Sequence, residues 1–229
     1  MFRDLTGWLL DLIYPPVCVL CGEYSAGELL CPACRNNLEE VRSDGSQEAE
    51  IRRLHPELEL LVTPFLYTGD IRALLLRLKT ASDRRAVDFL AEELAQALAD
   101  SGIPEVVVTC MPMSREKLRR RGFNHAELLA KAVAARLGSR FDAKLLEHHG
   151  GLTDQHSLSR EQRGENARRV IRPGRSSPQG RVVLLVDDIC TTGATLAECA
   201  RVLREAGAAD VVCAAAALTP LERDSGKKA

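Results

Sequence analysis

The sequence predicts an α/β protein, with a parallel sheet covered by helices on both faces and a small cysteine-rich module in front of it. From residue 60 onward, short apolar runs alternate with longer segments of helical periodicity, a pattern typical of strands joined by helical crossovers. Before residue 60, four cysteines stand in two closely spaced pairs. The 229 residues, 45% of them hydrophobic, suffice for one sizeable core plus a small extra module.

The alternation predicts each element in turn. We expect a helix near residues 5–13, then the cysteine pairs, then a connector that is partly helical near 48–54. Strands are expected at 60–67, 106–110, 181–186 and 211–217, and helices at 71–79, 86–99, 126–137 and 194–206. Strand, helix and strand in this order favour right-handed parallel crossovers. The predicted organisation is a cysteine module over 1–40, a connector over 41–59, the main domain over 60–220 and a flexible tail over 221–229.

Charge and hydropathy exclude several classes of protein. Lys and Arg total 31 against 32 for Asp and Glu, so any nucleic-acid contact must come from local clusters of charge. No apolar stretch reaches the roughly 18 to 20 residues of a membrane span, and the N-terminal run lacks the basic region and cleavage site of a signal peptide. Four further cysteines stand alone in apolar segments, which fits a reducing compartment. We expect a cytoplasmic protein with no direct membrane span.

The cysteine pairs have the spacing of two zinc knuckles. Cys18 and Cys21 form one Cys-x-x-Cys pair, and Cys31 and Cys34 form the other. Four thiolates fill the tetrahedral shell of one Zn²⁺ and leave no open position, so the expected role of the metal is structural. A redox dithiol is the alternative, but such a pair normally opens a helix inside a thioredoxin-like unit. The spacing therefore favours structural zinc held by these four cysteines.

Two adjacent acids, Asp187 and Asp188, follow the apolar run at 182–186. A loop of small and hydroxylated residues comes next and leads into a helix; it contains Thr191, Thr192, Gly193, Ala194 and Thr195. The carboxyl edge of a parallel sheet is where open α/β folds bind ligands. Loop amides, hydroxyls and a helix N-terminus suit a phosphate, and a glycine lets the backbone close around it. Helix capping alone would explain one threonine, but not this whole set.

This motif resembles the loop of type I phosphoribosyltransferases that binds 5-phosphoribosyl 1-pyrophosphate (PRPP). The resemblance implies that Asp187 and Asp188 hold the ribose hydroxyls and that residues 191–195 hold the 5-phosphate. It also implies Mg²⁺ as a cofactor that bridges the pyrophosphate and the ribose. A purine-salvage enzyme is disfavoured, because that branch usually has an acid where this chain has Thr191.

Further segments narrow the resemblance to the ComF family, phosphoribosyltransferase-like proteins associated with DNA uptake during natural transformation. These segments are residues 67–72 leading to Lys79, residues 111–115, residues 119–124, and residues 152–160 followed by Arg163. With the cysteine knuckles, the resemblance covers residues 14–218. One departure is His125, where the family commonly has Gln. The resemblance implies a type I phosphoribosyltransferase-like domain, PRPP as a ligand, and competence helicase and membrane-channel proteins as partners.

Basic side chains gather beside these motifs. From Arg115 to Arg121, five basic residues stand against one acid, and we expect Arg115 to contact PRPP. Candidate contacts to single-stranded DNA or to pyrophosphate are Lys79, Arg119, Arg120, Arg121, Phe123, Arg160 and Arg163. For any one arginine, a solvated charged face remains the alternative. Phe123 could instead pack under the following helix, and Lys79 could interact with the end of its own helix.

Two functions of different class are compatible with these motifs. The first is a PRPP-binding protein that acts in DNA uptake and handles single-stranded DNA. The alternative is an active phosphoribosyltransferase that moves ribose 5-phosphate from PRPP to an unidentified acceptor, by positioning and charge stabilisation. A zinc-dependent interaction module on an inert scaffold would leave the segment 187–195 without a role. The sequence contains no recognisable acceptor-reading residues, so it assigns no catalytic residue and leaves both functions open.

Overall fold

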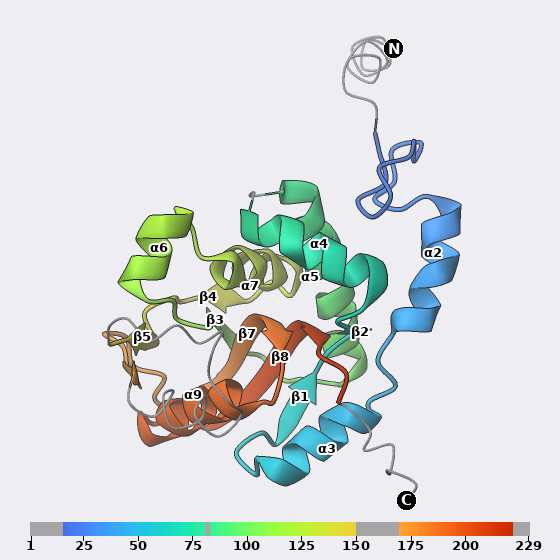
Figure 1. Ribbon diagram of the computed structural model, residues 1–229. Helices are drawn as coiled ribbons and strands as arrows, with labels where there is room; N and C mark the ends of the chain where they lie inside the picture. Colours follow the sequence, from blue (N-terminus) through green and yellow to red (C-terminus); the bar gives the residue numbers. More distant parts are fainter. Residues whose placement is uncertain (1–15, 81–82, 150–169, 222–229) are drawn as a thin grey trace, which may run out of the picture.

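A six-stranded parallel sheet forms the centre of the computed structural model, which describes residues 16–80, 83–149 and 170–221 (Figure 1). The strand order is β1-β8-β7-β3-β4, and β2 also pairs with β8. The strands of this sheet are β1 (Leu60–Val62), β2 (Phe65–Leu66), β3 (Val107–Cys110), β4 (Arg140–Phe141), β7 (Val182–Cys190) and β8 (Asp210–Leu218). A separate antiparallel pair consists of β5 (Leu146–His148) and β6 (Ile171–Pro173).

Helices cover both faces of the sheet, as expected for parallel strands. Figure 1 shows α4, α5 and α7 over one face, and α9 with α3 over the other. The helices are α2 (Pro32–Leu38), α3 (Ser46–Leu54), α4 (Gly69–Thr80), α5 (Arg84–Asp100), α6 (Arg115–Arg121), α7 (His125–Arg136) and α9 (Ala194–Glu205), with a 3-10 turn η1 (Glu39–Val41). Along β7, Leu184 and Val186 pack in the apolar cluster that includes α4, α5 and α7. Val183 and Leu185 point to the other face and pack in the cluster that includes α3 and α9. Both faces of the strand are therefore buried in apolar side chains.

The structure confirms the predicted fold class and the long elements. The four expected helices of the main domain are present as α4, α5, α7 and α9, with bounds within two residues of those predicted. The single strand expected over 60–67 is wrong, because Thr63 and Pro64 separate β1 from β2. A proline has no N–H to donate to the ladder, so the strand is interrupted there. The sequence favours the end of a strand at residues 148–149, and β5 ends at His148, but the short elements α2, α6, β4 and β6 were not predicted, since so few residues carry no periodic signal.

The connector packs as part of the main core. Helix α3 lies where a helix was expected, and its Ile51 is fully buried with Leu58 beside the residues of α9. Glu48, also on α3, is buried and accepts hydrogen bonds from Thr63 and from Ser43, the latter at 2.8 Å. These contacts fix α3 against the turn between β1 and β2.

The cysteine module packs on α4 and α5. Cys18, Val19 and Leu38 are buried in the same apolar cluster as the inner faces of those helices. At the rim of the module, Arg85 of α5 donates a hydrogen bond of 3.0 Å to the Glu28 carbonyl, and Arg77 of α4 donates to the Val19 carbonyl. The module is thus held by apolar burial and by charged contacts at its rim. The helix expected near 5–13 and the tail from 222 lie outside the described residues.

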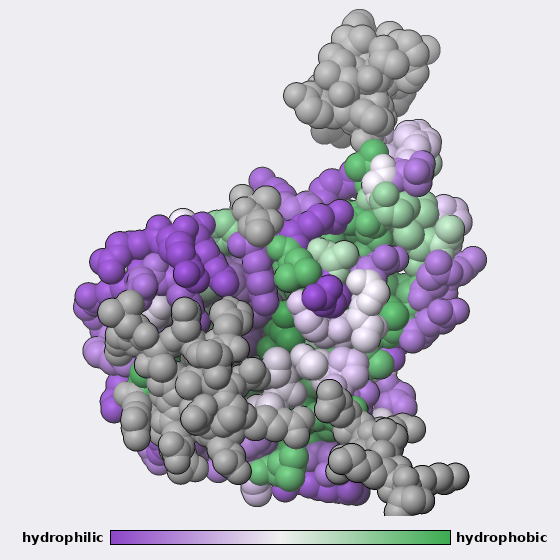
Figure 2. Space-filling view, viewed as in Figure 1, coloured by the Kyte–Doolittle hydropathy of each residue, from purple (hydrophilic) through white to green (hydrophobic). Residues whose placement is uncertain are grey.

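Helix α6 lies on the surface of the main domain. None of its residues is buried, and Figure 2 shows hydrophilic side chains gathered over this part of the surface. Ser114 begins the helix by accepting a hydrogen bond from the Lys117 N–H at 3.2 Å, and Gly122 ends it in the left-handed conformation. Across the described residues, no helix is long and apolar enough to cross a membrane.

Candidate functional site

A cavity of about 280 Å³ opens where β7 continues beyond the end of β3. The ladder between these strands ends at the pair Cys110 and Val186, whereas β7 stays paired with β8 as far as Cys190. We expected the strand to end before the acids, but it carries Asp187 and Asp188 within it. Both acids line the cavity because β3 no longer covers that edge of β7.

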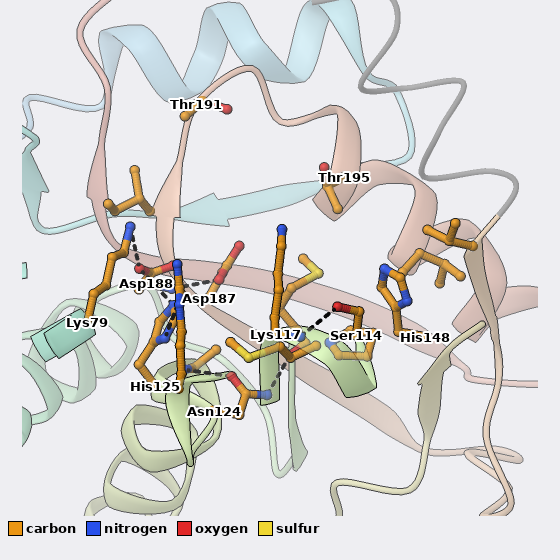
Figure 3. A pocket seen from close by; sticks show the side chains of 18 residues that line it. Lys79, Ser114, Lys117, Asn124, His125, His148, Asp187, Asp188, Thr191 and Thr195 are labelled. Atoms are coloured by element: carbon orange, nitrogen blue, oxygen red, sulfur yellow. Dashed lines mark hydrogen bonds and ion pairs between the residues drawn. The ribbon is translucent and has the colours of Figure 1, made fainter. Parts of the chain in front are cut away.

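The cavity wall combines cations, carboxylates and hydroxyls from separate elements. Figure 3 shows their side chains converging on one space. The charged and hydroxylated residues in the lining are Lys79, Lys117, Arg121, Asp187, Asp188, Ser114, Thr191 and Thr195. Three cationic side chains face two carboxylates, so the wall has the balance of charge that suits an anionic ligand bearing hydroxyl groups.

Asp188 is buried and is held by two helices at once. Its Oδ2 lies 3.1 Å from Lys79 Nζ of α4 and 3.2 Å from His125 Nε2 of α7 (Figure 3). Burial by itself would raise the pKa of this carboxyl group. The hydrogen bond from His125 and the charge of Lys79 outweigh it and hold the pKa of Asp188 well below its usual range. Asp188 is therefore a carboxylate at neutral pH.

Asp187 has the opposite electrostatic environment. Desolvation and the neighbouring Asp188 carboxylate raise the pKa of Asp187 well above its ordinary value. Its Oδ1 accepts a hydrogen bond of 2.8 Å from the Asp188 backbone N–H, which opposes that rise only in part. The pKa values of these two neighbouring acids are thus shifted in opposite directions, so Asp187 holds a proton more readily than Asp188 does.

The loop from Thr191 to Thr195 joins β7 to α9. Thr191 and Thr195 line the cavity, and Thr192 accepts a hydrogen bond of 3.4 Å from the N–H of Ala194. Gly193 is the N-cap of α9, with φ 78°, and a Cβ there would lie 2.5 Å from Ile51 Cγ2. This glycine is required by its left-handed backbone and by the side chain packed behind the loop.

A second cavity, of about 910 Å³, adjoins the first along α6. It shares Pro112, Met113, Asn124 and His148 with the lining of the first cavity. Arg115, which we expected at the PRPP site, lines this second cavity instead, together with Arg119. Since residues 115 and 119 are one helical turn apart, their side chains fall on the same face of α6.

The remaining predicted residues divide into three groups. Lys79 and Arg121 line the first cavity. Arg120 is exposed and Phe123 is half-buried, and neither belongs to the lining of these two cavities. Arg160 and Arg163 lie outside the described residues.

Asn124, His125 and His148 complete the wall and were not predicted as site residues. Asn124 Oδ1 accepts from the Ala126 N–H at 3.1 Å, while its Nδ2 donates to the Met111 carbonyl at 3.1 Å. It thereby joins the start of α7 to the loop after β3. The departure from the family pattern at His125 was the one signal in the sequence that could have identified this position.

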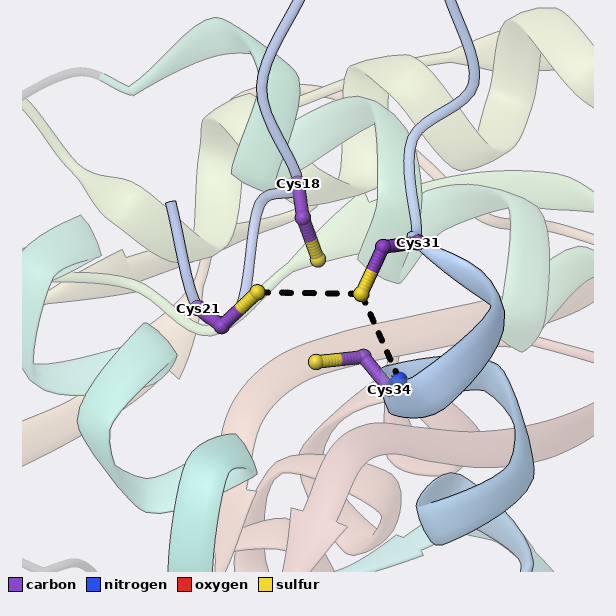
Figure 4. A group of neighbouring side chains, drawn as sticks. All are labelled: Cys18, Cys21, Cys31 and Cys34. Carbon is purple, nitrogen blue, oxygen red and sulfur yellow. Dashed lines mark hydrogen bonds between the residues drawn. The ribbon is translucent and has the colours of Figure 1, made fainter. Parts of the chain in front are cut away.

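The four clustered cysteines have the geometry of a metal site (Figure 4). The sulfurs of Cys18, Cys21, Cys31 and Cys34 all lie within 4.8 Å of one another, and Cys21 Sγ is 3.7 Å from Cys31 Sγ. A tetrahedral Zn²⁺ with bonds of about 2.3 Å separates its sulfurs by about 3.8 Å, so these residues fit the metal. Burial raises the pKa of the Cys18 thiol, but backbone hydrogen bonds outweigh it and bring that pKa to about 6.

Two family models match the chain. The phosphoribosyl transferase domain matches residues 84–228, and the double zinc ribbon domain matches residues 9–45. The zinc ribbon match and the cysteine cluster together support a structural zinc site. Residues 46–83 belong to neither match, although they include α3 and α4, which contact the loop and Asp188.

Curated relatives share about a third of the residues over the aligned part of the chain, and the alignments cover part of each protein. DNA utilization protein YhgH of Salmonella typhi is 33% identical over 159 residues, 68% of this chain and 65% of that protein. YhgH of Escherichia coli (strain K12) is 30% identical over 162 residues, 68% of this chain and 70% of that protein. Competence protein ComFC of Streptococcus pneumoniae is 32% identical over 123 residues, 54% of this chain and 50% of that protein. The chain thus spans about two thirds of the YhgH relatives that it matches.

Both domain matches and these relatives lead to the same assignment, which confirms the resemblance seen in the sequence: the chain belongs to the ComF family, with a type I phosphoribosyltransferase fold behind an N-terminal double zinc ribbon.

Proposed function

We propose that this protein binds PRPP with Mg²⁺ in the cavity beside Asp187 and Asp188, and that it acts in DNA uptake. The observation that carries the proposal is the convergence of two acids with opposite pKa shifts, a hydroxyl-lined loop and three cationic side chains on one cavity. PRPP offers matching groups, because it has vicinal ribose hydroxyls, a 5-phosphate and a pyrophosphate.

Each part of the ligand has a candidate partner. The Asp188 carboxylate accepts from a ribose hydroxyl, while Asp187, whose pKa is raised, can donate to one in its protonated form. The 5-phosphate lies against Thr191, Thr195 and the first turn of α9, where backbone N–H groups and the helix dipole favour an anion. Bound Mg²⁺ supplies positive charge to the pyrophosphate oxygens.

Lys117 and Arg121 extend this set of partners toward the pyrophosphate. Both come from α6 and line the first cavity, on the side next to the loop that follows β3. Their charges offset part of the negative charge that the two phosphate groups bring into the cavity.

The exposed basic surface of α6 is the proposed contact for single-stranded DNA. Arg115, Arg119 and Arg120 are exposed there, and five basic residues of the segment face one acid. Such clusters bind the phosphate backbone without reading the sequence. The names of the relatives, DNA utilization protein and competence protein, favour the same role. We place helicase and membrane-channel proteins of DNA uptake among its partners.

The second cavity favours transfer as a second candidate function. It adjoins the proposed PRPP site and shares part of its wall, so an acceptor there would lie next to the ribose. In that case the acceptor would attack the ribose carbon as pyrophosphate departs, with the site contributing orientation and charge stabilisation. Pyrophosphate release in the presence of PRPP, Mg²⁺ and a panel of acceptors would show this activity.

Titration calorimetry with PRPP and Mg²⁺ tests the binding proposal. The wild-type protein should bind, and the double variant Asp187→Asn, Asp188→Asn should lose at least about tenfold in affinity, because it loses hydrogen bonds to charged groups. Asp88→Asn, on the outer face of α5, is the matched control and should bind like wild type. Absence of binding by the wild-type protein at millimolar PRPP would refute the proposal.

A further inference from the structure

Two side chains from different helices contact the same oxygen of the Asp188 carboxylate. Lys79 Nζ and His125 Nε2 both contact Oδ2, at 3.1 and 3.2 Å, and they come from two different helices, α4 and α7. The side chains of His125 and Asp188 are 7% and 9% exposed, so the contact is largely shielded from water. Two contacts on Oδ2 from different helices restrict the rotation of the Asp188 side chain.

Arg121 sets the tautomer of His125. Its Nη1 lies 3.5 Å from His125 Nδ1, and a guanidinium can only donate hydrogen bonds. Nδ1 must therefore be the acceptor, so the ring proton is on Nε2, which faces Asp188. His125 therefore presents its Nε2 to the Asp188 carboxylate at 3.2 Å, beside the positive charge of Lys79 at 3.1 Å.

A role in starting the helix does not explain the side chain of His125. It is the first residue of α7, but the cap of that helix is Asn124, which accepts from the Ala126 N–H. The His125 ring instead points toward β7 and closes the chain of contacts from Arg121 to Asp188 (Figure 3).

We propose that His125 is a positioning residue of the ligand site: it holds the Asp188 carboxylate, together with Lys79, in the orientation that accepts the ribose hydroxyl. This inference rests on the proposed PRPP function and adds a residue to it. It also accounts for the departure at position 125, because a glutamine there can present its own N–H donor to Asp188.

The test compares two substitutions of similar length at position 125, with affinity for PRPP and Mg²⁺ measured by calorimetry. His125→Gln keeps an N–H donor, and its affinity should stay within about threefold of wild type. His125→Met has no hydrogen-bond donor, and its affinity should fall about tenfold. The melting temperature of each variant, measured alongside, separates a loss of affinity from a loss of folding. Equal affinity in the two variants would overturn the proposal.

A mutant cycle then asks whether His125 acts through Asp188. In the Asp188→Asn background, His125→Met should lower the affinity for PRPP by less than about twofold, because the carboxylate that His125 orients is gone. A further tenfold loss in that background would mean that His125 contacts the ligand by itself, and would refute a positioning role. Lys131→Met, on the exposed face of α7, is the control for a changed side chain on the same helix.

The outcomes also separate this inference from the proposed function. If the wild-type protein fails to bind PRPP, the function is wrong, and the inference falls with it. If the wild-type protein and His125→Met bind PRPP equally well, the function stands and only the role of His125 is refuted.

Discussion

Ile51 of α3 lies directly behind Gly193, the residue that turns β7 into α9. A Cβ on Gly193 would lie 2.5 Å from Ile51 Cγ2 and 3.1 Å from Leu58 Cδ1. Both apolar side chains are buried and come from outside the matched phosphoribosyl transferase domain. The connector therefore forms the back wall of the proposed phosphate loop.

Gly193→Ala should destabilise the protein by about 2 to 5 kcal/mol. The left-handed backbone costs an alanine about 1 to 2 kcal/mol, and the overpacking against Ile51 adds about 1 to 3 kcal/mol. Gly45→Ala is the matched control, since Gly45 has φ 80° and no atom within 4 Å of the added Cβ. Urea unfolding of both variants gives the comparison. Equal losses would contradict a packing role for Ile51.

Asp187→Asn should stabilise the folded protein near pH 7, by about 1 kcal/mol, while it weakens ligand binding. Because the pKa of Asp187 is raised in the folded state, the unfolded chain loses its proton first as the pH rises. The free energy of unfolding of the wild-type protein therefore decreases as the pH rises through and above the usual pKa range of a carboxyl group. An asparagine amide does not titrate, so the variant avoids this loss. Thermal unfolding at pH 3 and pH 7 should show the gain at pH 7 only.

Asp188→Asn should have the opposite effect on stability. The pKa of Asp188 is lowered in the folded state, so its contribution is complete above the unfolded pKa and is lost as the pH falls toward the folded one. The variant leaves Lys79 without its carboxylate partner, and a loss of about 3 kcal/mol is expected at pH 7. A gain of stability in the same unfolding experiment would contradict the ion pair.

Glu48→Ala should lower the free energy of unfolding by about 1 to 3 kcal/mol. The buried carboxylate accepts from Ser43 and Thr63, and its loss leaves both hydroxyls without this partner. Glu50→Ala is the control on the same helix, because Glu50 forms only a surface pair of 3.1 Å with Arg53. Denaturant unfolding of the two variants should give clearly different midpoints.

Cys21→Ser should reduce bound zinc well below one ion per chain. Cys21 is the exposed member of the cluster, so its substitution tests the metal site with little change in packing. Zinc analysis of the purified variant, with the wild-type protein and a chelator-treated sample beside it, provides the measurement. Full zinc content in the variant would argue against four-thiolate binding.

Arg115→Ala combined with Arg119→Ala should weaken binding to single-stranded DNA and make it less sensitive to salt. Removing two phosphate contacts reduces the slope of log affinity against log salt by about 1.4. Arg52→Ala combined with Arg53→Ala removes the same charge from the exposed side of α3 and should leave the slope unchanged. Fluorescence anisotropy with an oligothymidine over a range of salt concentrations measures both, and equal slopes would place the DNA contact elsewhere.

Local patterns in the sequence were enough to predict many of the helices and strands of this protein. Buried parallel strands are continuous apolar runs and long helices repeat every 3.6 residues, so α5, α7, α9 and β8 were predicted nearly to their ends. The two Cys-x-x-Cys pairs, and the two acids followed by threonines, are also motifs formed by residues close together in the sequence. The zinc cluster and the loop of the proposed site were therefore visible in the sequence.

Only the tertiary structure decided which distant side chains meet at that loop. Lys79 and His125 reach Asp188 because α4 and α7 lie on the same face of the sheet, and Ile51 reaches Gly193 because α3 lies on the other. Arg115 has the right charge, yet the orientation of α6 directs it into the second cavity. A sequence determines periodicity and local turns, whereas the partners of a buried carboxylate depend on packing between elements far apart in the chain.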